Sequence, residues 1–352
     1  MTTEEFFDNF LTTEVNLTKI CEGECKGNQS GCDICLVTSK YKDLVEELKK
    51  ELKILPSEDE ENLPSHFLTG SYRRHTMIRP PKDVDLFIVL DSGEYLDIEL
   101  HDLITPKALI TRLKSALEKI FEDSKEVSVE EQRHSVTVVY NKKFSIDVIP
   151  AFETDDKKAY KIPDIENNQA EHYISSNPKI HYQYINDVND TTSINGKKRF
   201  KKIARLLKFI KRKKFNSEPT KIRSFHFELL AAQILGSDKI TSYSTGLNDF
   251  LSAASSYFDK SIITDPANKE NKIDDYIDDL DSNTKDLIKS QLDSLAKITN
   301  HAIELEESGN ETEAINEWKK IFYVDQDNSS KGNNPSRTTY VGSSPPKPWS
   351  YV

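Results

Sequence analysis

The feature that most constrains the fold is a short stretch in which two aspartates open an apolar run. Asp83 and Asp85, separated by a valine, lead directly into residues 86–90, which read Leu-Phe-Ile-Val-Leu and predict a buried β-strand. Because side chains alternate along a strand, both carboxylates are expected on one face of it. Carboxylates this close resist joint ionisation, and oxygen ligands favour magnesium over zinc. The stretch therefore predicts a divalent-cation site at the start of a core strand.

A Gly-Ser pair lies upstream of the aspartates, directly after a short apolar segment. Gly70 has no Cβ, so the backbone there can approach a phosphate closely. The Ser71 hydroxyl and the neighbouring N–H groups can donate hydrogen bonds to phosphate oxygens. The pair therefore predicts contact with a phosphate group.

A third acid is expected, because a two-metal site for phosphoryl transfer needs one more ligand. Residues 134–140 and 144–149 are β-rich runs around a polar turn and predict a hairpin. Asp147 lies alone in the second, apolar run, where a buried acid is costly unless it is paired or bound to a metal. We therefore expect Asp147 to be the third metal ligand.

The order of these features resembles a known superfamily. A Gly-Ser pair, a spacer, Asp-x-Asp and a distant strand aspartate are typical of the DNA polymerase β-like nucleotidyltransferases. The fuller run that begins at Gly70 and the later Ile-Asp-Val-Ile-Pro-Ala around Asp147 are similar to the cGAS/DncV-like branch (CD-NTases), which is related to oligoadenylate synthases. The resemblance extends over roughly residues 36–322 by the order of motifs. One departure is His75, where that branch often has a small residue.

The resemblance implies an α+β fold, with a polymerase β-like core of a mixed sheet and helices, and a C-terminal helical domain that completes a bilobal cleft. It implies that Asp83, Asp85 and Asp147 hold two Mg²⁺, with Mn²⁺ as a substitute, on a donor triphosphate. The implied reaction joins NTPs, ATP among them, into a cyclic di- or trinucleotide second messenger with release of pyrophosphate. Its implied setting is bacterial antiphage (CBASS) signalling, with a regulatory protein partner or a downstream effector that senses the product.

Three other functions stay open at this point. The first is a linear 2′-5′ oligonucleotide synthase, and the second is a nucleotidyltransferase that modifies RNA or protein. The third belongs to a different class, a non-catalytic, zinc-stapled binding module on a degenerate scaffold. A degenerate scaffold usually loses an acid, and all three acids are present, so the binding module is the weakest alternative.

Residues 197–214 contain eleven Lys or Arg and no acid, with apolar residues at helical spacing. This pattern predicts an amphipathic basic helix, whose charge indicates either an anionic ligand or a solvated face. The family resemblance implies that Lys208 and Ser224 hold donor phosphates and that Phe225 stacks on a base. The alternatives are that Ser224 caps the helix predicted over 225–235 and that Phe225 belongs to its core. Lys211 is expected to be solvated.

All four cysteines of the chain lie between residues 21 and 35, and they are Cys21, Cys25, Cys32 and Cys35. Two short pairs of thiolates can complete a zinc tetrahedron, and such a site would be structural. The spacing is not that of a standard zinc finger, and disulfides are disfavoured in the cytosol. The cysteines therefore predict either a structural Zn²⁺ site or four reduced thiols in a surface insertion.

The length of 352 residues is sufficient for two domains of ordinary size. Residues 153–195 are rich in Asp, Asn and Tyr and predict a mostly irregular stretch. The predicted organisation is N-terminal helices with the cysteine insertion (1–55), a catalytic core (56–195), a helical C-terminal domain (196–325) and a flexible tail (326–352).

The charged fraction of 30% and the hydrophobic fraction of 36% suit a soluble globular protein. The sequence has no apolar run of membrane-spanning length and no signal-peptide pattern at its start, which predicts a cytoplasmic protein without a membrane partner. A net charge of -11 argues against extensive nucleic-acid binding.

Overall fold

The computed structural model describes residues 1–20, 31–55, 65–97, 102–141, 144–165 and 172–323. Contacts within the chain define two compact units, and each is described by itself. Among the described residues, a mixed α/β unit comprises Leu17–Tyr182, and a helical unit comprises Met1–Asn16 and the chain from Gln183 onward. The predicted tail, 326–352, lies outside the described residues.

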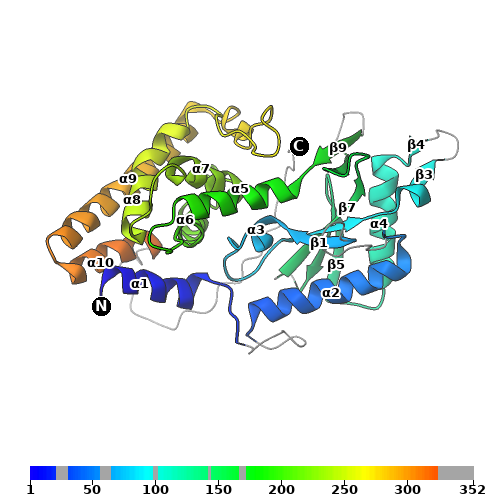
Figure 1. Cartoon of the computed structure of the whole chain (residues 1–352), viewed down its shortest axis with the longest axis horizontal. Coiled ribbons are helices and arrows are strands. Elements are labelled where there is room, and N and C mark those ends of the chain that lie inside the picture. The colour runs from blue at the N-terminus through cyan, green and yellow to red at the C-terminus, as the bar shows by residue number, and fades with distance from the viewer. Residues whose placement is uncertain (21–30, 56–64, 98–101, 142–143, 166–171, 324–352) are drawn as a thin grey trace. The chain divides into compact units, whose positions relative to one another are not determined.

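A seven-stranded mixed sheet forms the centre of the α/β unit (Figure 1). The strand order is β1-β2-β7-β6-β5, and β8 pairs with both β7 and β9. Strands β2 and β7 run parallel, and the other pairs described in this sheet are antiparallel. The strands are β1 (His66–Thr69), β2 (Val84–Val89), β5 (Val127–Glu131), β6 (Val136–Tyr140), β7 (Phe144–Glu153), β8 (Tyr160–Asp164) and β9 (His172–Ser176). A separate two-stranded sheet pairs β3 (Leu96–Asp97) with β4 (Asp102–Leu103).

Helices α2 (Asp33–Glu51) and α4 (Pro106–Ile120) pack against one face of the large sheet. Helix α4 begins at residue types that favour a helix start, with Thr105 as its N-cap and Pro106 in its first turn. The main core is formed by apolar residues of both helices and of β2, β6 and β7, among them Leu44, Leu48, Leu109, Leu113, Leu86, Val138 and Ile146. Burial of each such leucine contributes about 1.5 to 3 kcal/mol to stability.

The opposite face of the sheet carries a smaller apolar cluster. Phe87, Ile149, Tyr160 and Ile162 belong to it, and the rings of Phe87 and Tyr160 lie 5.9 Å apart. Because successive strand residues alternate between faces, the odd-numbered residues of β2 and β7 point to this side of the sheet. Asp85 and Asp147 are therefore on the face that α2 and α4 do not cover.

Helices build the second unit: α6 (Phe200–Lys214), α7 (Ser224–Leu235), α8 (Tyr243–Ala254), α9 (Ser282–Glu307) and α10 (Glu311–Phe322). Short 3-10 segments, η3 (Ser255–Tyr257) and η4 (Asp275–Ile277), lie between α8 and α9. Helix α5 (Pro178–Thr191) contains the boundary between the two units.

The N-terminal helix α1 (Thr3–Phe10) packs with the C-terminal helices. The ring of Phe7 lies 5.1 Å from that of Trp318, and the Tyr243 hydroxyl donates a hydrogen bond of 2.7 Å to Asp8. The Arg199 side chain forms an ion pair of 2.8 Å with Glu4. The structure thus groups the first helix with residues far along the chain, and not with α2 as in the predicted segment 1–55.

Some predicted elements differ from those of the structure. Residues 153–195 were expected to be mostly irregular, and this is wrong, because they include β8, β9 and all of α5. Helix α2 begins at Asp33, earlier than the start near residue 41 that its leucine spacing indicates.

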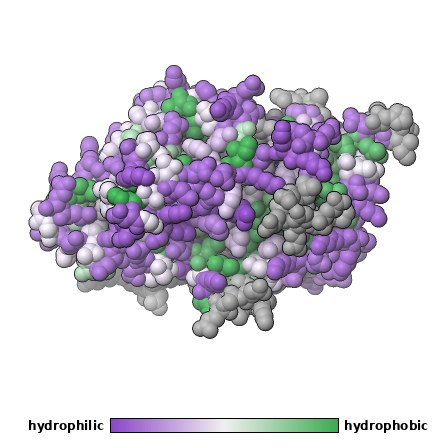
Figure 2. Space-filling model, viewed as in Figure 1, coloured by the Kyte–Doolittle hydropathy of each residue, from purple (hydrophilic) through white to green (hydrophobic). Residues whose placement is uncertain are grey.

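No helix in the described ranges is both long and apolar enough to cross a membrane. Side chains on the face drawn in Figure 2 are mostly hydrophilic, with apolar ones scattered among them.

Candidate active site

A row of polar residues crosses four neighbouring strands of the sheet. The register places Thr137 of β6 opposite Asp147 of β7, Asp147 opposite Asp85 of β2, and Asp85 opposite Thr69 of β1. Residues directly opposite each other point to the same face, and neighbouring strands lie about 4.8 Å apart. The two predicted carboxylates therefore lie side by side on one face of the sheet.

Asp147 is oriented by a hydrogen bond from the next strand. The Thr137 hydroxyl donates to Asp147 Oδ1 at 2.6 Å. Both Asp85 and Asp147 are only 5% exposed. Buried carboxylates of this kind are costly without compensating partners, which favours a cation as part of the site.

Asp83 lies directly before β2 and is held in the same way. Its backbone has a φ of 49°, and the Ser145 hydroxyl donates to its Oδ1 at 2.8 Å. Ser145 precedes Asp147 by two residues on β7 and so points to the same face. The structure thus brings the three predicted acids into one neighbourhood. Within the described residues, no three His, Cys, Asp or Glu side chains converge closely enough to hold a single ion.

Gly70 makes room for one of these acids. Its φ is +61°, and a Cβ built on it would lie 1.8 Å from Asp85 Oδ2. Only glycine fits both this left-handed backbone and this close approach. The sequence predicts contact with a phosphate at this position, and the structure adds a second reason for glycine, the place of the Asp85 carboxylate.

The chain after Gly70 forms the four-residue helix α3 (Gly70–Arg73), followed by a tight turn. The Ser71 carbonyl accepts hydrogen bonds from the N–H groups of Thr76 and Met77, both at 3.0 Å. His75 has a φ of 58°, a conformation in which a Cβ is strained. This backbone explains why a small residue suits position 75, and it leaves the acids unaffected.

The possible metal ligands of this site are carboxylate oxygens of the three aspartates. One of them, Asp85 Oδ2, lies in the space that Gly70 leaves open. Hard oxygen donors of this kind fit Mg²⁺ or Mn²⁺ and not a thiolate-preferring metal. The residues present therefore fit a divalent cation.

Sequence reasoning missed two residues of this site, Thr137 and Ser145. Both are buried, and each donates a hydrogen bond to one of the acids. Their signal in the sequence is a polar residue at an alternate position of an otherwise apolar strand, on the same face as Asp147.

In the helical unit, Lys208 forms a buried ion pair with Glu228 of α7. The side chain of Lys208 is 7% exposed and that of Glu228 is fully buried. The ammonium that the resemblance assigns to donor phosphates thus has a carboxylate partner within its own unit.

Lys211, one turn further along α6, was expected to be solvated, and this is wrong, because it is 6% exposed. Its Nζ donates to the Ser224 hydroxyl at 3.4 Å, and no carboxylate of a described residue lies within ion-pair distance of it. Burial, and then the nearby cations Arg212 and Lys221, lower the pKa of Lys211 to about 8. A buried cation without a carboxylate is the charge that an anionic ligand would stabilise.

Ser224 does not cap the helix, which corrects the alternative role considered for it. Arg223 is the N-cap of α7, and Ser224 is the first helical residue, exposed to solvent. Phe225 is half-buried and does not belong to the buried core, so its predicted stacking on a base stays a prediction.

Other cations of α6 and its flank have acidic partners in the same unit. Lys198 pairs with Asp190 at 2.7 Å, and Lys202 pairs with Asp8 at 3.2 Å. Together with the pairs of Arg199 and Lys208, these contacts neutralise much of the charge that the sequence offers to a ligand.

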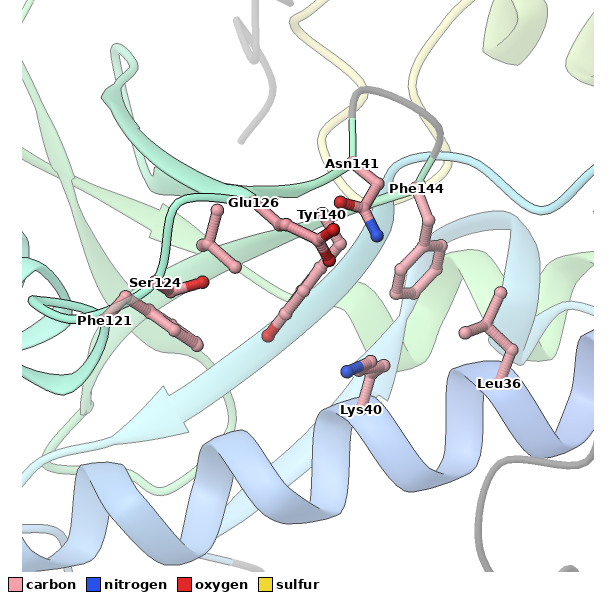
Figure 3. A pocket seen from close by; sticks show the side chains of 9 residues that line it. Leu36, Lys40, Phe121, Ser124, Glu126, Tyr140, Asn141 and Phe144 are labelled. Atoms are coloured by element: carbon pink, nitrogen blue, oxygen red, sulfur yellow. The ribbon is translucent and has the colours of Figure 1, made fainter.

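A cavity of about 500 Å³ lies between α2, the end of α4 and the hairpin of β6 and β7 (Figure 3). Its wall includes the rings of Phe121, Tyr140 and Phe144, and Lys40 Nζ lies 5.1 Å from the centre of the Tyr140 ring. Tyr140 and Phe144 belong to the helix-covered core, on the opposite face from Asp147. The cavity is therefore separate from the acids.

The structure describes two of the four cysteines. Cys32 and Cys35 are both buried, and Cys32 is the N-cap of α2, where its Sγ accepts from the Cys35 N–H at 3.4 Å. Cys21 and Cys25 lie outside the described residues. The predicted zinc site is thus not tested, and it stays a prediction.

Residues 34–189 match the family model of the Second Messenger Oligonucleotide or Dinucleotide Synthetase domain (SMODS). The matched segment contains Gly70, Ser71 and all three acids. This segment is similar to the cGAS/DncV-like nucleotidyltransferases, which confirms the resemblance in its motifs. The match supports an enzyme of the nucleotidyltransferase class.

Two curated relatives of the chain support this similarity. A probable cyclic nucleotide synthase of Bacillus cereus is 26% identical over 279 residues, which cover 72% of this chain and 79% of the relative. A cyclic AMP-AMP-AMP synthase of an Acinetobacter species is 29% identical over 175 residues, 47% of this chain and 45% of the relative.

Solved structures confirm the fold of the chain. CdnC of Escherichia coli MS115-1, in a complex with HORMA-deltaN, superposes with a TM-score of 0.64 at 17% identity, over 91% of this chain and 96% of that chain. The Vibrio cholerae cyclic AMP-GMP synthase DncV superposes with a TM-score of 0.57 at 17% identity, over 74% of this chain and 68% of that chain. The expected mixed sheet with helices and the helical C-terminal part are thus confirmed.

Proposed function

We propose that this chain joins NTPs into a cyclic di- or trinucleotide second messenger and releases pyrophosphate, in antiphage (CBASS) signalling. The observation that carries the proposal is the polar row in which Asp85 and Asp147 lie side by side, with Gly70 packed against Asp85. The names of the two curated relatives support a cyclic product, and the Acinetobacter relative supports ATP as a substrate.

In this proposal Asp83, Asp85 and Asp147 hold two Mg²⁺ ions, for which Mn²⁺ can substitute. When bound, the metals lower the pKa of the attacking ribose hydroxyl and neutralise the departing pyrophosphate. Thr137 and Ser145 fix two of the carboxylates through the hydrogen bonds that they donate. The buried surroundings strengthen each of these electrostatic interactions. Gly70 and Ser71 contact phosphate oxygens through the backbone of their turn and the serine hydroxyl.

In the helical unit, Lys211 and Ser224 bind phosphate groups of an NTP. Support comes from the burial of the Lys211 ammonium without a carboxylate of a described residue at ion-pair distance, and from its hydrogen bond to Ser224. Lys208, which the family resemblance favours, adds positive potential one turn earlier but shares its ammonium with Glu228. Phe225 follows Ser224 and is available to stack on a base.

The proposal is tested by incubating the purified full-length chain with all four labelled NTPs and Mg²⁺ or Mn²⁺. Products that resist phosphatase are then separated and identified by mass. The matched control is the double variant Asp83→Asn with Asp85→Asn, which removes two acids and keeps the fold, because loss of like charges relieves repulsion. A phosphatase-resistant product in the wild type only is the expected result, and the same yield from the variant would refute the assignment of the acids.

The same experiment separates the alternatives. A linear 2′-5′ oligonucleotide keeps a terminal phosphate that phosphatase removes, and label transferred to added RNA or protein indicates a modifying enzyme. A chain that forms no product but retains zinc and binds a partner supports the binding module.

Two further features are proposed. We infer a regulatory protein partner, because a structural neighbour, CdnC, forms a complex with HORMA-deltaN.

We also infer a structural Zn²⁺ at Cys21, Cys25, Cys32 and Cys35, which metal analysis of the purified protein tests. About one zinc per chain supports the site, and four freely titrating thiols without zinc refute it.

A further inference from the structure

The first turn of α7 is attached to η4 through Tyr276 and the neighbouring Asp275. This turn carries Ser224, so its position determines whether the serine hydroxyl stays beside Lys211. We infer that Tyr276 is a positioning residue for nucleotide binding, which holds Ser224 against Lys211. The inference rests on the proposed function, because it takes these two residues to be the phosphate contacts.

The Tyr276 hydroxyl lies between two groups of α7. The N–H of Arg223 donates to it at 3.3 Å, and it lies 2.7 Å from Nδ1 of His226. His226 is fully buried, and burial lowers its pKa to about 3, so the ring is neutral near pH 7. The hydroxyl accepts from Arg223 and shares one hydrogen bond with His226 Nδ1, whose direction follows the tautomer of the neutral ring. Tyr276 thus bridges the N-cap residue and the third residue of the helix.

The tyrosine ring and its neighbour hold the same turn from a second side. The Arg223 guanidinium lies 4.3 Å from the centre of the Tyr276 ring, and its Nη1 donates to Asp275 at 2.9 Å. The same Asp275 oxygen accepts from the backbone N–H of Tyr276 at 2.8 Å. Two residues of η4, Asp275 and Tyr276, therefore form one connected network with the N-cap residue Arg223.

This network anchors the N-cap residue of α7, which makes no side-chain cap hydrogen bond. The first N–H groups of a helix have no partner within the helix. An uncapped first turn frays easily, and fraying would carry the exposed Ser224 away from Lys211. A serine that is held in place before the ligand arrives loses less conformational entropy on binding, so the ligand binds more tightly.

The test compares Tyr276→Phe with Tyr257→Phe in the full-length chain. Tyr257 belongs to η3 in the same unit, and no hydrogen bond of its hydroxyl to a described residue occurs, so its variant controls for loss of a phenol. Tyr276→Phe is expected to raise the KM for ATP about three- to tenfold, the effect of one hydrogen bond, and to change kcat far less. Asp275→Asn, a change of an exposed residue, is expected to raise KM in the same direction and covers the case that Tyr276→Phe folds poorly.

A double-mutant cycle distinguishes positioning from a general loss of stability. In a Ser224→Ala background, Tyr276→Phe should raise KM no further, because the group that it positions is absent. Unchanged KM in Tyr276→Phe and Asp275→Asn, or equal effects of Tyr276→Phe with and without Ser224, would overturn the inference.

The cycle also separates this inference from the proposed function. A wild-type chain that forms no product and does not bind ATP in calorimetry refutes the proposed function and the inference with it. Product formation that is insensitive to Ser224→Ala keeps the nucleotidyl transfer and refutes the role of Tyr276 alone.

Discussion

At position 70 the absence of a side chain lets Asp85 lie against the turn. We expect Gly70→Ala to abolish product formation, because the new Cβ would lie 1.8 Å from Asp85 Oδ2 and displace the carboxylate. The matched control is Gly196→Ala, which has the same left-handed backbone, φ +73°, and open space around the Cβ. Both changes carry a strain of about 1 to 2 kcal/mol, so a loss of activity at position 70 only would isolate the clash. Equal activities of the two variants would contradict the role of Gly70.

A second residue-scale prediction concerns Thr137, which orients Asp147 through its hydroxyl. Thr137→Val keeps the shape of the side chain and removes the donor, so kcat should fall about tenfold or more, as for a hydrogen bond to a charged group. Thr137→Ser keeps the donor and should retain most of the activity. Steady-state kinetics at saturating ATP measures both, and a Val variant as active as the Ser variant would show that Asp147 needs no orientation.

At this scale the sequence predicts the acids but not the partners of the lysines. Asp83, Asp85 and Asp147 are recognisable because charged residues interrupt apolar strands. Lys208 and Lys211 are three residues apart and lie on one side of α6, so spacing alone cannot separate them. Only the packing of α7 determines that Glu228 meets the first of them.

At the scale of elements, the two buried lysines of α6 have different partners, Glu228 for Lys208 and Ser224 for Lys211. Variants of the two lysines should therefore have different effects on stability and on ATP binding. Lys208→Ala leaves Glu228 buried without its cation and should lower the free energy of unfolding by about 3 to 5 kcal/mol. Lys211→Ala removes a buried charge that has no carboxylate at ion-pair distance among the described residues, so stability should be kept while the KM for ATP rises. Denaturant unfolding and ATP kinetics measure the two effects, and the reverse pattern would favour Lys208 as the phosphate contact.

The lowered pKa of Lys211 adds a dependence on pH. Its pKa falls from an ordinary 10.5 to about 8 in the folded protein, so above about pH 8 the ammonium loses its proton and ATP binding should weaken. As the pH rises, the contribution of Lys211 to the free energy of unfolding changes in the opposite direction to its contribution to ATP binding. Between these two values the unfolded chain binds more protons than the folded one, so the contribution of Lys211 to stability rises with pH. A KM profile that stays flat from pH 7 to 9.5 in the wild type would contradict the role of Lys211.

The elements themselves were predictable where local pattern and burial agree. The strand after Asp83, the hairpin around residues 141–143 and the start of α4 at Pro106 each have a clear periodicity or cap. The region 153–195 has neither, because β9 is largely exposed and α5 is rich in polar residues, so its structure depends on pairing and packing. Tertiary contacts of this kind override weak local preference.

At the scale of the whole molecule, the first helix belongs to the helical unit although it opens the chain. Phe7→Ala should lower the free energy of unfolding by about 3 to 5 kcal/mol, because the ring is fully buried against Trp318 and Tyr243. Ile20→Ala, at a position that is 61% exposed, should change it little and serves as the control. Calorimetry measures both, and equal stabilities would contradict the packing of α1. No local pattern in the sequence could reveal this grouping, because its contacts join residues from the two ends of the described chain.

The parallel pairing of β2 and β7 fixes the distance between two of the acids, Asp85 and Asp147. The interval between Asp85 and Asp147 is set by the backbone hydrogen bonds of two adjacent strands, and no loop contributes to it. The chain between these strands can therefore gain or lose residues over evolution without altering the distance between the two acids. The connection between α4 and β5 is one place where relatives can diversify, and where an engineer can insert a reporter segment, while the spacing of the two acids stays constant.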